Sequence, residues 1–162
     1  MIELNETSSR LEQNKALIRR VEEAWQADDW ETLDDLFARD MISHAAVPYL
    51  PPGLSGWKMA HHQMRRAVPD RQVTLEDVIA EGDRVVVRCR MVGTNLGGLP
   101  WAGVAPNRHR IDMEWISIYR IEGQRVAEHW AINDMMRLVQ QIGAPPDLIR
   151  SRVLRGGWPV LG

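Results

Sequence analysis

The segment that decides the fold is residues 126–136, which read Val-Ala-Glu-His-Trp-Ala-Ile-Asn-Asp-Met-Met. As a strand, this segment alternates its side chains between two faces. One face carries Val126, Glu128, Trp130, Ile132 and Asp134, and the other carries Ala127, His129, Ala131 and Asn133. The alternation therefore places Asp134 at the end of a face that also presents a tryptophan and an isoleucine.

Asp134 has two interpretations. An apolar wall beside a carboxyl group disfavours the ionised form, which is how a protein makes an acid/base catalyst from aspartate. The alternative is a helix N-cap, because residues 135–142 form a helical run that Gly143 and two following prolines terminate. A catalytic Asp134 is expected to be shielded from water, whereas a cap is expected at the surface.

Composition indicates one globular domain without a nucleic-acid or membrane partner. The chain has 162 residues, of which 44% are hydrophobic and 26% charged, with a net charge of -2. This charge gives no attraction to nucleic acid or to an anionic membrane, and no apolar run is long enough to span a bilayer. The polar N-terminus does not resemble a signal peptide. A single cysteine, Cys89, excludes an internal disulfide, so we expect a cytoplasmic protein.

The first part of the chain has helical spacing. Residues 1–10 are polar and expected to be flexible. From Leu11 an apolar stripe predicts a helix, and a short second helix and a third helix at 57–67, capped by Ser55, follow. The first stripe consists of Leu17, Ile18, Val21 and Trp25, and Glu22 and Glu23 are expected on the solvated face.

The second part of the chain has strand spacing. Strands are predicted at 73–79, 84–94, 109–122 and over the opening segment, with tight turns at 81–83 and 122–124. In the third strand one face carries Ile111, Met113, Trp115, Ser117 and Tyr119. Helices followed by a meandering antiparallel sheet predict an α+β fold, in which a curved sheet wraps around the N-terminal helices as a cone. The Gly/Pro-rich loop 93–107 is interpreted as a lid or a contact surface.

Six motifs resemble the SnoaL-like polyketide cyclase family of the nuclear transport factor 2-like superfamily. They are Asn-Lys-Ala-Leu-Ile-Arg-Arg (14–20), Ala-Val-Pro-Asp (67–70), Val-Ile-Ala-Glu-Gly-Asp-Arg-Val-Val-Val-Arg (78–88), Gly-Thr-Asn (93–95), Ile-Tyr-Arg-Ile-Glu-Gly (118–123) and Glu-His-Trp (128–130). The resemblance covers residues 11–143 and implies a cone-shaped α+β domain, usually dimeric through the outer face of the sheet. Residues 144–162 would be a C-terminal tail that packs on a partner subunit.

The resemblance also implies a reaction. Characterised members close a ring by intramolecular aldol condensation without cofactor or metal, with a late aspartate as general acid/base. That aspartate corresponds to Asp134, and a family histidine corresponds to His44. The chain departs from the family at Asn95, where a histidine is common, and in the loop 97–107. The related epoxide hydrolases need two aspartates where this chain has Arg90 and Ile132, which disfavours that activity.

Several side chains are candidates for substrate contacts. Hydrophobic contacts are predicted from Met113, Trp115, Trp130 and Ile132, and donors to an enolate from His44, Arg90 and His61. Each has a structural alternative. The tryptophans could equally be core residues, His44 a loop histidine bonded to backbone, and His61 a packing or surface residue. Arg88 and Arg90 share a face and are expected to pair with Asp112 or Glu114 across strands.

His129 lies opposite Trp130 in the alternation, so it is expected on the outer side of the sheet or in a dimer contact. No spacing of histidine or cysteine suggests a metal site. Two functions follow from these observations. The first is a dimeric, cofactor-independent cyclase or isomerase acting on a small hydrophobic carbonyl compound. The second is a non-catalytic ligand-binding or dimerisation module with the same fold.

Overall fold

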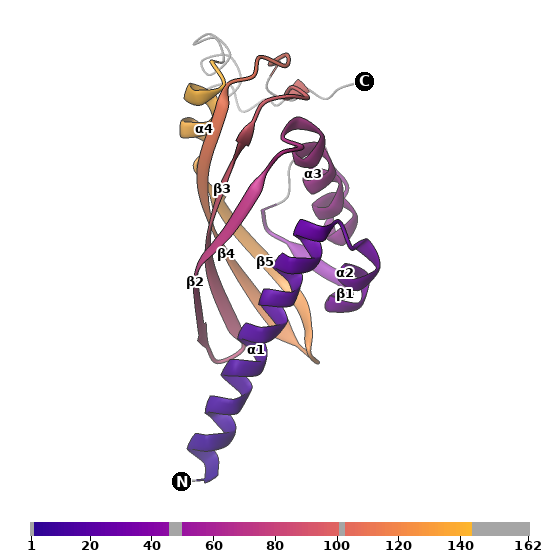
Figure 1. Cartoon of the computed structure of the whole chain (residues 1–162). Coiled ribbons are helices and arrows are strands. Elements are labelled where there is room, and N and C mark those ends of the chain that lie inside the picture. Colours follow the sequence, from indigo (N-terminus) through magenta and orange to yellow (C-terminus); the bar gives the residue numbers. More distant parts are fainter. Residues whose placement is uncertain (1, 46–49, 101–102, 144–162) are drawn as a thin grey trace. The chain divides into compact units, whose positions relative to one another are not determined.

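The computed structural model describes residues 2–45, 50–100 and 103–143, so the predicted C-terminal tail lies outside the described residues. Within these ranges the chain forms four helices and five strands (Figure 1). In chain order they are α1 (Ile2–Ala27), α2 (Trp30–Leu36), β1 (Phe37–Ser43), α3 (Gly53–Ala67), β2 (Gln72–Glu81), β3 (Arg84–Thr94), β4 (Arg110–Glu122), β5 (Arg125–Asn133) and α4 (Met135–Gln141). The predicted α+β class is confirmed.

The five strands form one sheet in the order β1-β5-β4-β3-β2. Tight turns join β2 to β3 and β4 to β5, so these pairs are antiparallel. Strands β3 and β4 are also antiparallel, because Ile121 N donates to Asp83 O at one end and Asn95 N donates to His109 O at the other. Strand β1, which was not predicted, adds to this antiparallel sheet by pairing with β5 in parallel, and it aligns Ser43 with His129.

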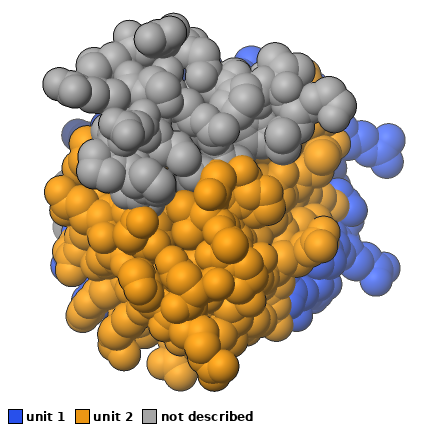
Figure 2. Space-filling view, turned by 90° about the horizontal axis from the view of Figure 1, so that it is seen from above, with its two compact units in different colours: residues 1–45, 75–89, 115–132 blue, residues 46–74, 90–114, 133–162 orange. Residues whose placement is uncertain are grey.

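The chain divides into two compact units (Figure 2). Of the described residues, unit 1 comprises 2–45, 75–89 and 115–132, drawn blue, and unit 2 comprises 50–74, 90–100, 103–114 and 133–143, drawn orange. Strands β2 to β5 each contribute residues to both units. The two units are described separately below.

The core of unit 1 confirms the predicted helical stripe. Ile18, Val21 and Trp25 of α1 are buried, and the edge of the Trp25 ring meets Trp115 of β4 at 5.9 Å between ring centres. Further apolar side chains from α2, β1 and β3 complete this core, namely Leu33, Leu36, Phe37, Met41, Val85, Val87 and Cys89. Helix α1 is therefore held against the sheet by its apolar side, which drives packing in an amphipathic helix.

The helix limits differ from the sequence prediction at two places. Helix α1 begins at Ile2, so residues 2–10, expected to be a flexible N-terminus, are helical. Helix α3 begins at Gly53 after Pro52, and the predicted Ser55 cap is wrong because Ser55 lies inside the first turn. Among the described residues, no helix has the length and apolar character needed to cross a membrane.

Unit 2 contains an ordered turn after β3 that is organised around Asn95. This buried amide donates to Ala105 O at 3.2 Å and to Asn107 Oδ1 at 2.9 Å, and its Oδ1 accepts a hydrogen bond from Gly98 N. Gly97 packs directly on the end of α3, because a Cβ at this position would lie 1.8 Å from the Arg66 carbonyl oxygen. The loop thus has internal hydrogen bonds and a glycine that its packing requires.

Candidate functional site

Asp134 caps helix α4. Its Oδ1 accepts a hydrogen bond from Arg137 N at 3.0 Å, its backbone N–H donates to Glu114 O, and the residue is exposed. The N-cap interpretation of this aspartate is therefore confirmed. The expectation of a shielded carboxyl beside Trp130 is wrong, because the chain leaves the strand at Asn133 and places the aspartate at the start of the helix.

Helix α4 is held in place by its last residue and by an ion pair. The backbone N–H of Asp112 donates to Gln141 Oε1 at 2.8 Å, and Gln141 Nε2 donates to Asp112 O at 2.9 Å. The Asp112 carboxylate accepts two hydrogen bonds from Arg90, at 2.8 and 2.7 Å, and lies 3.8 Å from Arg137. These contacts lower the pKa of Asp112, chiefly through the Arg90 hydrogen bonds. They fix the helix that Asp134 begins.

The ion-pair alternative for Arg90 is thereby confirmed. Arg88 pairs with Asp77 of β2, through an Nε–Oδ2 distance of 2.7 Å. This pairing follows from the sheet order, because β3 lies between β2 and β4 and an outward side chain can reach either neighbour. Neither arginine is thus an isolated cation waiting for an anionic ligand.

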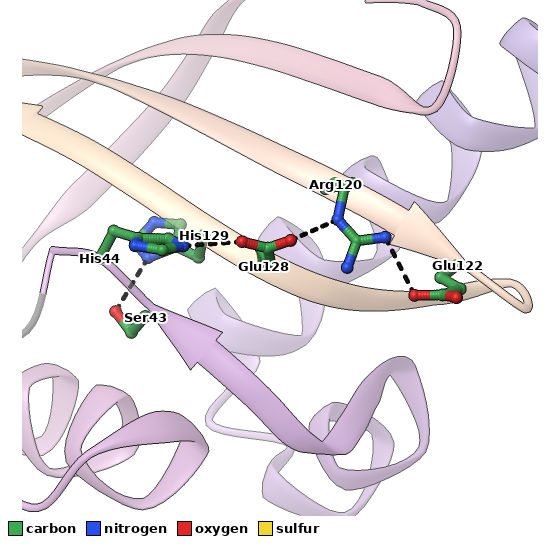
Figure 3. Close-up of polar contacts among 6 residues, drawn as sticks. All are labelled: Ser43, His44, Arg120, Glu122, Glu128 and His129. Atoms are coloured by element: carbon green, nitrogen blue, oxygen red, sulfur yellow. Dashed lines mark hydrogen bonds and ion pairs between the residues drawn. The ribbon is translucent and has the colours of Figure 1, made fainter.

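His44, the second predicted catalytic residue, lies in a polar cluster of unit 1 (Figure 3). Its Nε2 is 2.7 Å from Glu128 Oε2, and its backbone N–H donates to His129 O. Glu128 also accepts a hydrogen bond from Arg120, whose other nitrogen pairs with Glu122 (Figure 3). The pKa of Glu128 is lowered, first by His44 and then by Arg120. Glu128 is therefore an ionised acceptor that orients the His44 ring.

Trp130 belongs to the same cluster. The His44 ring stacks on it at 4.5 Å with an interplanar angle of 5°, and the Arg84 guanidinium carbon lies 5.1 Å from its ring centre. The structure thus brings two predicted site residues, His44 and Trp130, into direct contact. A histidine oriented by a carboxylate on an aromatic ring can donate or accept a proton from a defined direction.

The placement of His129 on the outer side of the sheet is wrong. His129 is 5% exposed, and its ring nitrogens lie 3.4 Å from Ser43 Oγ and 3.3 Å from Ser117 Oγ. Its ring is tilted on that of Tyr119 at 5.0 Å. Burial lowers the pKa of His129 to about 4, so the imidazole is neutral at physiological pH.

Glu22 is a polar residue of the core that the sequence prediction missed. Instead of lying on the solvated face of the first helix, it is 5% exposed and accepts a hydrogen bond from the Tyr119 hydroxyl at 3.1 Å. Burial raises the pKa of Glu22 to about 7, against a smaller lowering by Tyr119. Its position four residues after Ile18 and three before Trp25 is the spacing of the buried stripe, and this signal is present in the sequence.

The remaining predicted contacts occupy different environments. Met113 is buried in unit 2, Trp115 meets Trp25 in unit 1, and the His61 ring lies 3.9 Å from that of Trp57 on α3. Ile132 is 81% exposed. Within the described ranges, no group of three or more histidine, cysteine, aspartate or glutamate side chains is arranged to hold a metal ion.

Comparisons with known proteins agree with this fold. The model of the SnoaL-like polyketide cyclase family matches residues 15–142. IdmH of Streptomyces antibioticus, a proposed polyketide cyclase, is 30% identical with a TM-score of 0.70, and the match covers 81% of this chain and 99% of that chain. TsrD of Streptomyces laurentii is 27% identical with a TM-score of 0.70, covering 80% and 97%.

AclR of Streptomyces galilaeus shares the fold with a TM-score of 0.73 at 23% identity, covering 84% and 99%. A search of curated proteins finds no match. The structural relatives have the nuclear transport factor 2-like fold expected from the sequence, and the family match spans every strand and most of the helical residues. The chain is therefore a member of the SnoaL-like polyketide cyclase family.

Proposed function

We propose that this protein is a cofactor-independent enzyme that cyclises or isomerises a small, hydrophobic, carbonyl-containing molecule. The observation that carries the proposal is the family match over residues 15–142, which includes both His44 and Asp134. The similarity to IdmH, itself a proposed polyketide cyclase, points to the same class of substrate. Abstraction of a proton next to a carbonyl, followed by attack of the enolate, needs an acid/base group and a donor but no bound metal.

In this proposal Asp134 is the acid/base group. Its Oδ1 is hydrogen-bonded to Arg137 N, and among the described residues Oδ2 makes no hydrogen bond, so Oδ2 is the oxygen assigned to proton transfer. Because Asp134 is exposed, the bound substrate itself must shield the carboxylate from water. The contacts of Gln141 and Arg90 with Asp112 would hold helix α4, and so keep Asp134 at its start in one orientation.

We assign the other proposed roles to the polar and aromatic side chains described above. His44, oriented by Glu128, is the proposed donor to the developing enolate oxygen. Trp130 supplies an aromatic surface beside it. The proposed further substrate contacts are Met113, Trp115, Ile132, Arg90 and His61. The buried Cys89 thiol is compatible with a cytoplasmic location, which is part of the proposal.

A non-catalytic ligand-binding module is the second candidate. The observation that favours it is the exposure of Asp134, because a carboxylate that only caps a helix has no chemical task. Under this alternative the fold would bind the same class of hydrophobic molecule without converting it. The two candidates share the fold and differ in the turnover that depends on Asp134.

The test begins with a binding screen of aromatic polyketides and cyclic ketones, followed by turnover assays with the wild type and Asp134→Asn. The asparagine keeps a capping oxygen but cannot take a proton, so we expect retained binding and a loss of turnover of about 100-fold or more. Asp29→Asn, at the similarly exposed N-cap of α2, is the matched control. Unchanged turnover in Asp134→Asn rejects the catalytic assignment, and binding without turnover in the wild type favours the module.

We also propose that the protein forms a homodimer through the outward side of the strands in unit 1. Three large apolar side chains of these strands are exposed, namely Ile42, Ile79 and Ile116. Large apolar side chains exposed on a sheet can mark an interface. Sedimentation of the wild type should give a dimer that Ile116→Glu converts to a monomer, whereas Met59→Glu on α3 should leave it unchanged. A monomeric wild type would contradict the proposal.

A further inference from the structure

Unit 1 contains two buried titratable side chains that contact the same aromatic residue. Glu22 of α1 accepts a hydrogen bond from the Tyr119 hydroxyl, and the ring of His129 on β5 lies 5.0 Å from the Tyr119 ring. Both residues are 5% exposed. An acid from a helix and a base from a strand therefore meet at one side chain inside the same core.

Hydroxyl groups hydrogen-bond to both side chains. The Tyr119 hydroxyl hydrogen-bonds to Glu22, and the Ser43 and Ser117 hydroxyls hydrogen-bond to His129. A hydroxyl satisfies a polar atom, but it does not neutralise a charge. Burial with such partners disfavours a carboxylate and an imidazolium alike, so each group is held in its neutral form.

We propose that Glu22 and His129 form a compensating proton pair, which keeps the interior of unit 1 uncharged near pH 6 and cancels the pH dependence that either residue alone would impose on folding. Glu22 holds a proton that the unfolded chain releases. His129 lacks a proton that the unfolded chain binds. Folding therefore exchanges one proton for another at this cluster, and the stability of the fold becomes insensitive to mild acidification.

The pH window follows from the two shifts. Burial raises the Glu22 pKa from 4.5 to about 7, so its stabilisation is complete below pH 4.5 and is lost as the pH rises through 7. Burial lowers the His129 pKa from 6.5 to about 4, so its stabilisation is complete above pH 6.5 and is lost as the pH falls through 4. Between pH 4.5 and 6.5 the two slopes have opposite sign and cancel.

Other titratable groups face the pair from the neighbouring strands. Cys89 of β3 and Tyr119 of β4 face Glu22, and burial raises the pKa of both, so they remain neutral across this window. His44, which follows β1, faces His129 and electrostatically opposes its protonation, which lowers the His129 pKa further. Of these neighbours, His44 opposes protonation of His129, whereas the Tyr119 hydrogen bond lowers the Glu22 pKa by less than burial raises it.

The experiment measures urea unfolding of the full chain between pH 4.5 and 6.5 for the wild type, Glu22→Gln and His129→Gln. The double variant Glu22→Gln/His129→Gln supplies the background from all other groups, and Glu23→Gln, an exposed neighbour on α1, is the matched control that should keep the wild-type profile. Relative to the double variant, the unfolding equilibrium constant should be flat with pH in the wild type. It should fall about tenfold per rising pH unit in Glu22→Gln and rise about tenfold per unit in His129→Gln.

Parallel profiles in the two variants, or a steep wild-type profile, would overturn the proposal. If a variant does not fold, NMR titration of the wild type decides instead. The Glu22 carboxyl carbon should titrate close to pH 7 and the His129 ring close to pH 4. Ordinary midpoints of about 4.5 and 6.5 would reject the compensating pair.

Discussion

The Tyr119 hydroxyl donates a hydrogen bond to Glu22 Oε1 across 3.1 Å, and both side chains are buried. This contact joins α1 to β4 inside unit 1 through polar atoms, while the surrounding contacts of α1 are apolar. Removing the hydroxyl leaves a buried carboxyl without that donor. The contact therefore contributes both to the packing of α1 and to the protonation of Glu22.

We expect Tyr119→Phe to destabilise the fold by about 1–2 kcal/mol, the typical cost of a lost buried hydrogen bond. The Tyr119 bond lowers the Glu22 pKa, so its loss should raise that pKa above 7. Urea unfolding at pH 6 and NMR titration of Glu22 would measure these effects. In a Glu22→Gln background the change in stability should differ, and strict additivity of the two substitutions would show that the residues do not interact.

The two hydrogen bonds between the Gln141 side chain and the main chain of Asp112, here called the clamp, should be lost in Gln141→Ala, so we expect this variant to be less stable. Two hydrogen bonds of 2.8 and 2.9 Å disappear, and we expect a cost of about 1–2 kcal/mol by thermal or urea unfolding. Gln140→Ala is the matched control, because Gln140 is the exposed neighbour on the same helix. Equal effects of the two substitutions would contradict a specific clamp.

We expect a larger loss of folding stability from substitution of Asn95 than from substitution of Gln141. Asn95→Ala removes three hydrogen bonds at a fully buried position and strands the polar groups of the turn, so we expect about 3 kcal/mol of destabilisation. The exposed Asn133 provides the comparison, and Asn133→Ala should change stability little. A small effect at position 95 would mean that the turn does not depend on its central amide.

Gly97 predicts a steric effect that differs from the usual cost of replacing a turn glycine. In Gly97→Ala the new methyl group would meet the Arg66 carbonyl oxygen at 1.8 Å, so we expect about 3 kcal/mol of destabilisation. Gly123 has a positive φ of 56° and open space where a methyl group would be added, so Gly123→Ala should cost only about 1 kcal/mol. Melting temperatures that are lowered equally would argue against the close approach at Gly97.

The Arg90–Asp112 ion pair should make the folding stability depend on pH in the acidic range. Because the Asp112 pKa is lowered in the folded chain, its stabilisation is present above the ordinary value of 3.8 and is lost as the pH falls below it. Asp112→Asn should therefore flatten the acid limb of a stability profile measured from pH 5 to pH 2. Asp40→Asn, on β1, should leave that limb unchanged, and identical limbs in both variants would reject the assignment.

The faces of β4 could be predicted from the sequence, because strict alternation from Ile111 to Tyr119 has only one interpretation. The faces of β5 could not. Val126 and His129 are both buried although they are three residues apart, so the alternation is interrupted between them. Such an interruption reverses every side chain beyond it, which is why alternation predicts His129 outside while the structure places it inside.

The sequence predicted which residues belong to the candidate site better than it predicted what surrounds each of them. The residues of Glu-His-Trp cluster with His44, but local spacing alone does not reveal that Glu128 orients this histidine. For Asp134 the local signal of an N-cap was sufficient, whereas an acid/base environment depends on neighbours from distant segments. Glu22 shows the opposite error, since its charge predicts a solvated position while its place on the apolar stripe predicts burial.

The way in which α4 is attached has a consequence for engineering. The Gln141 side chain makes its two hydrogen bonds to peptide atoms of Asp112, and these atoms are the same whichever amino acid occupies position 112. A substitution at position 112 would therefore remove the ion pair with Arg137 but leave the two hydrogen bonds of Gln141 in place. The side-chain and main-chain attachments of the helix would then be adjustable independently at a single position of one strand.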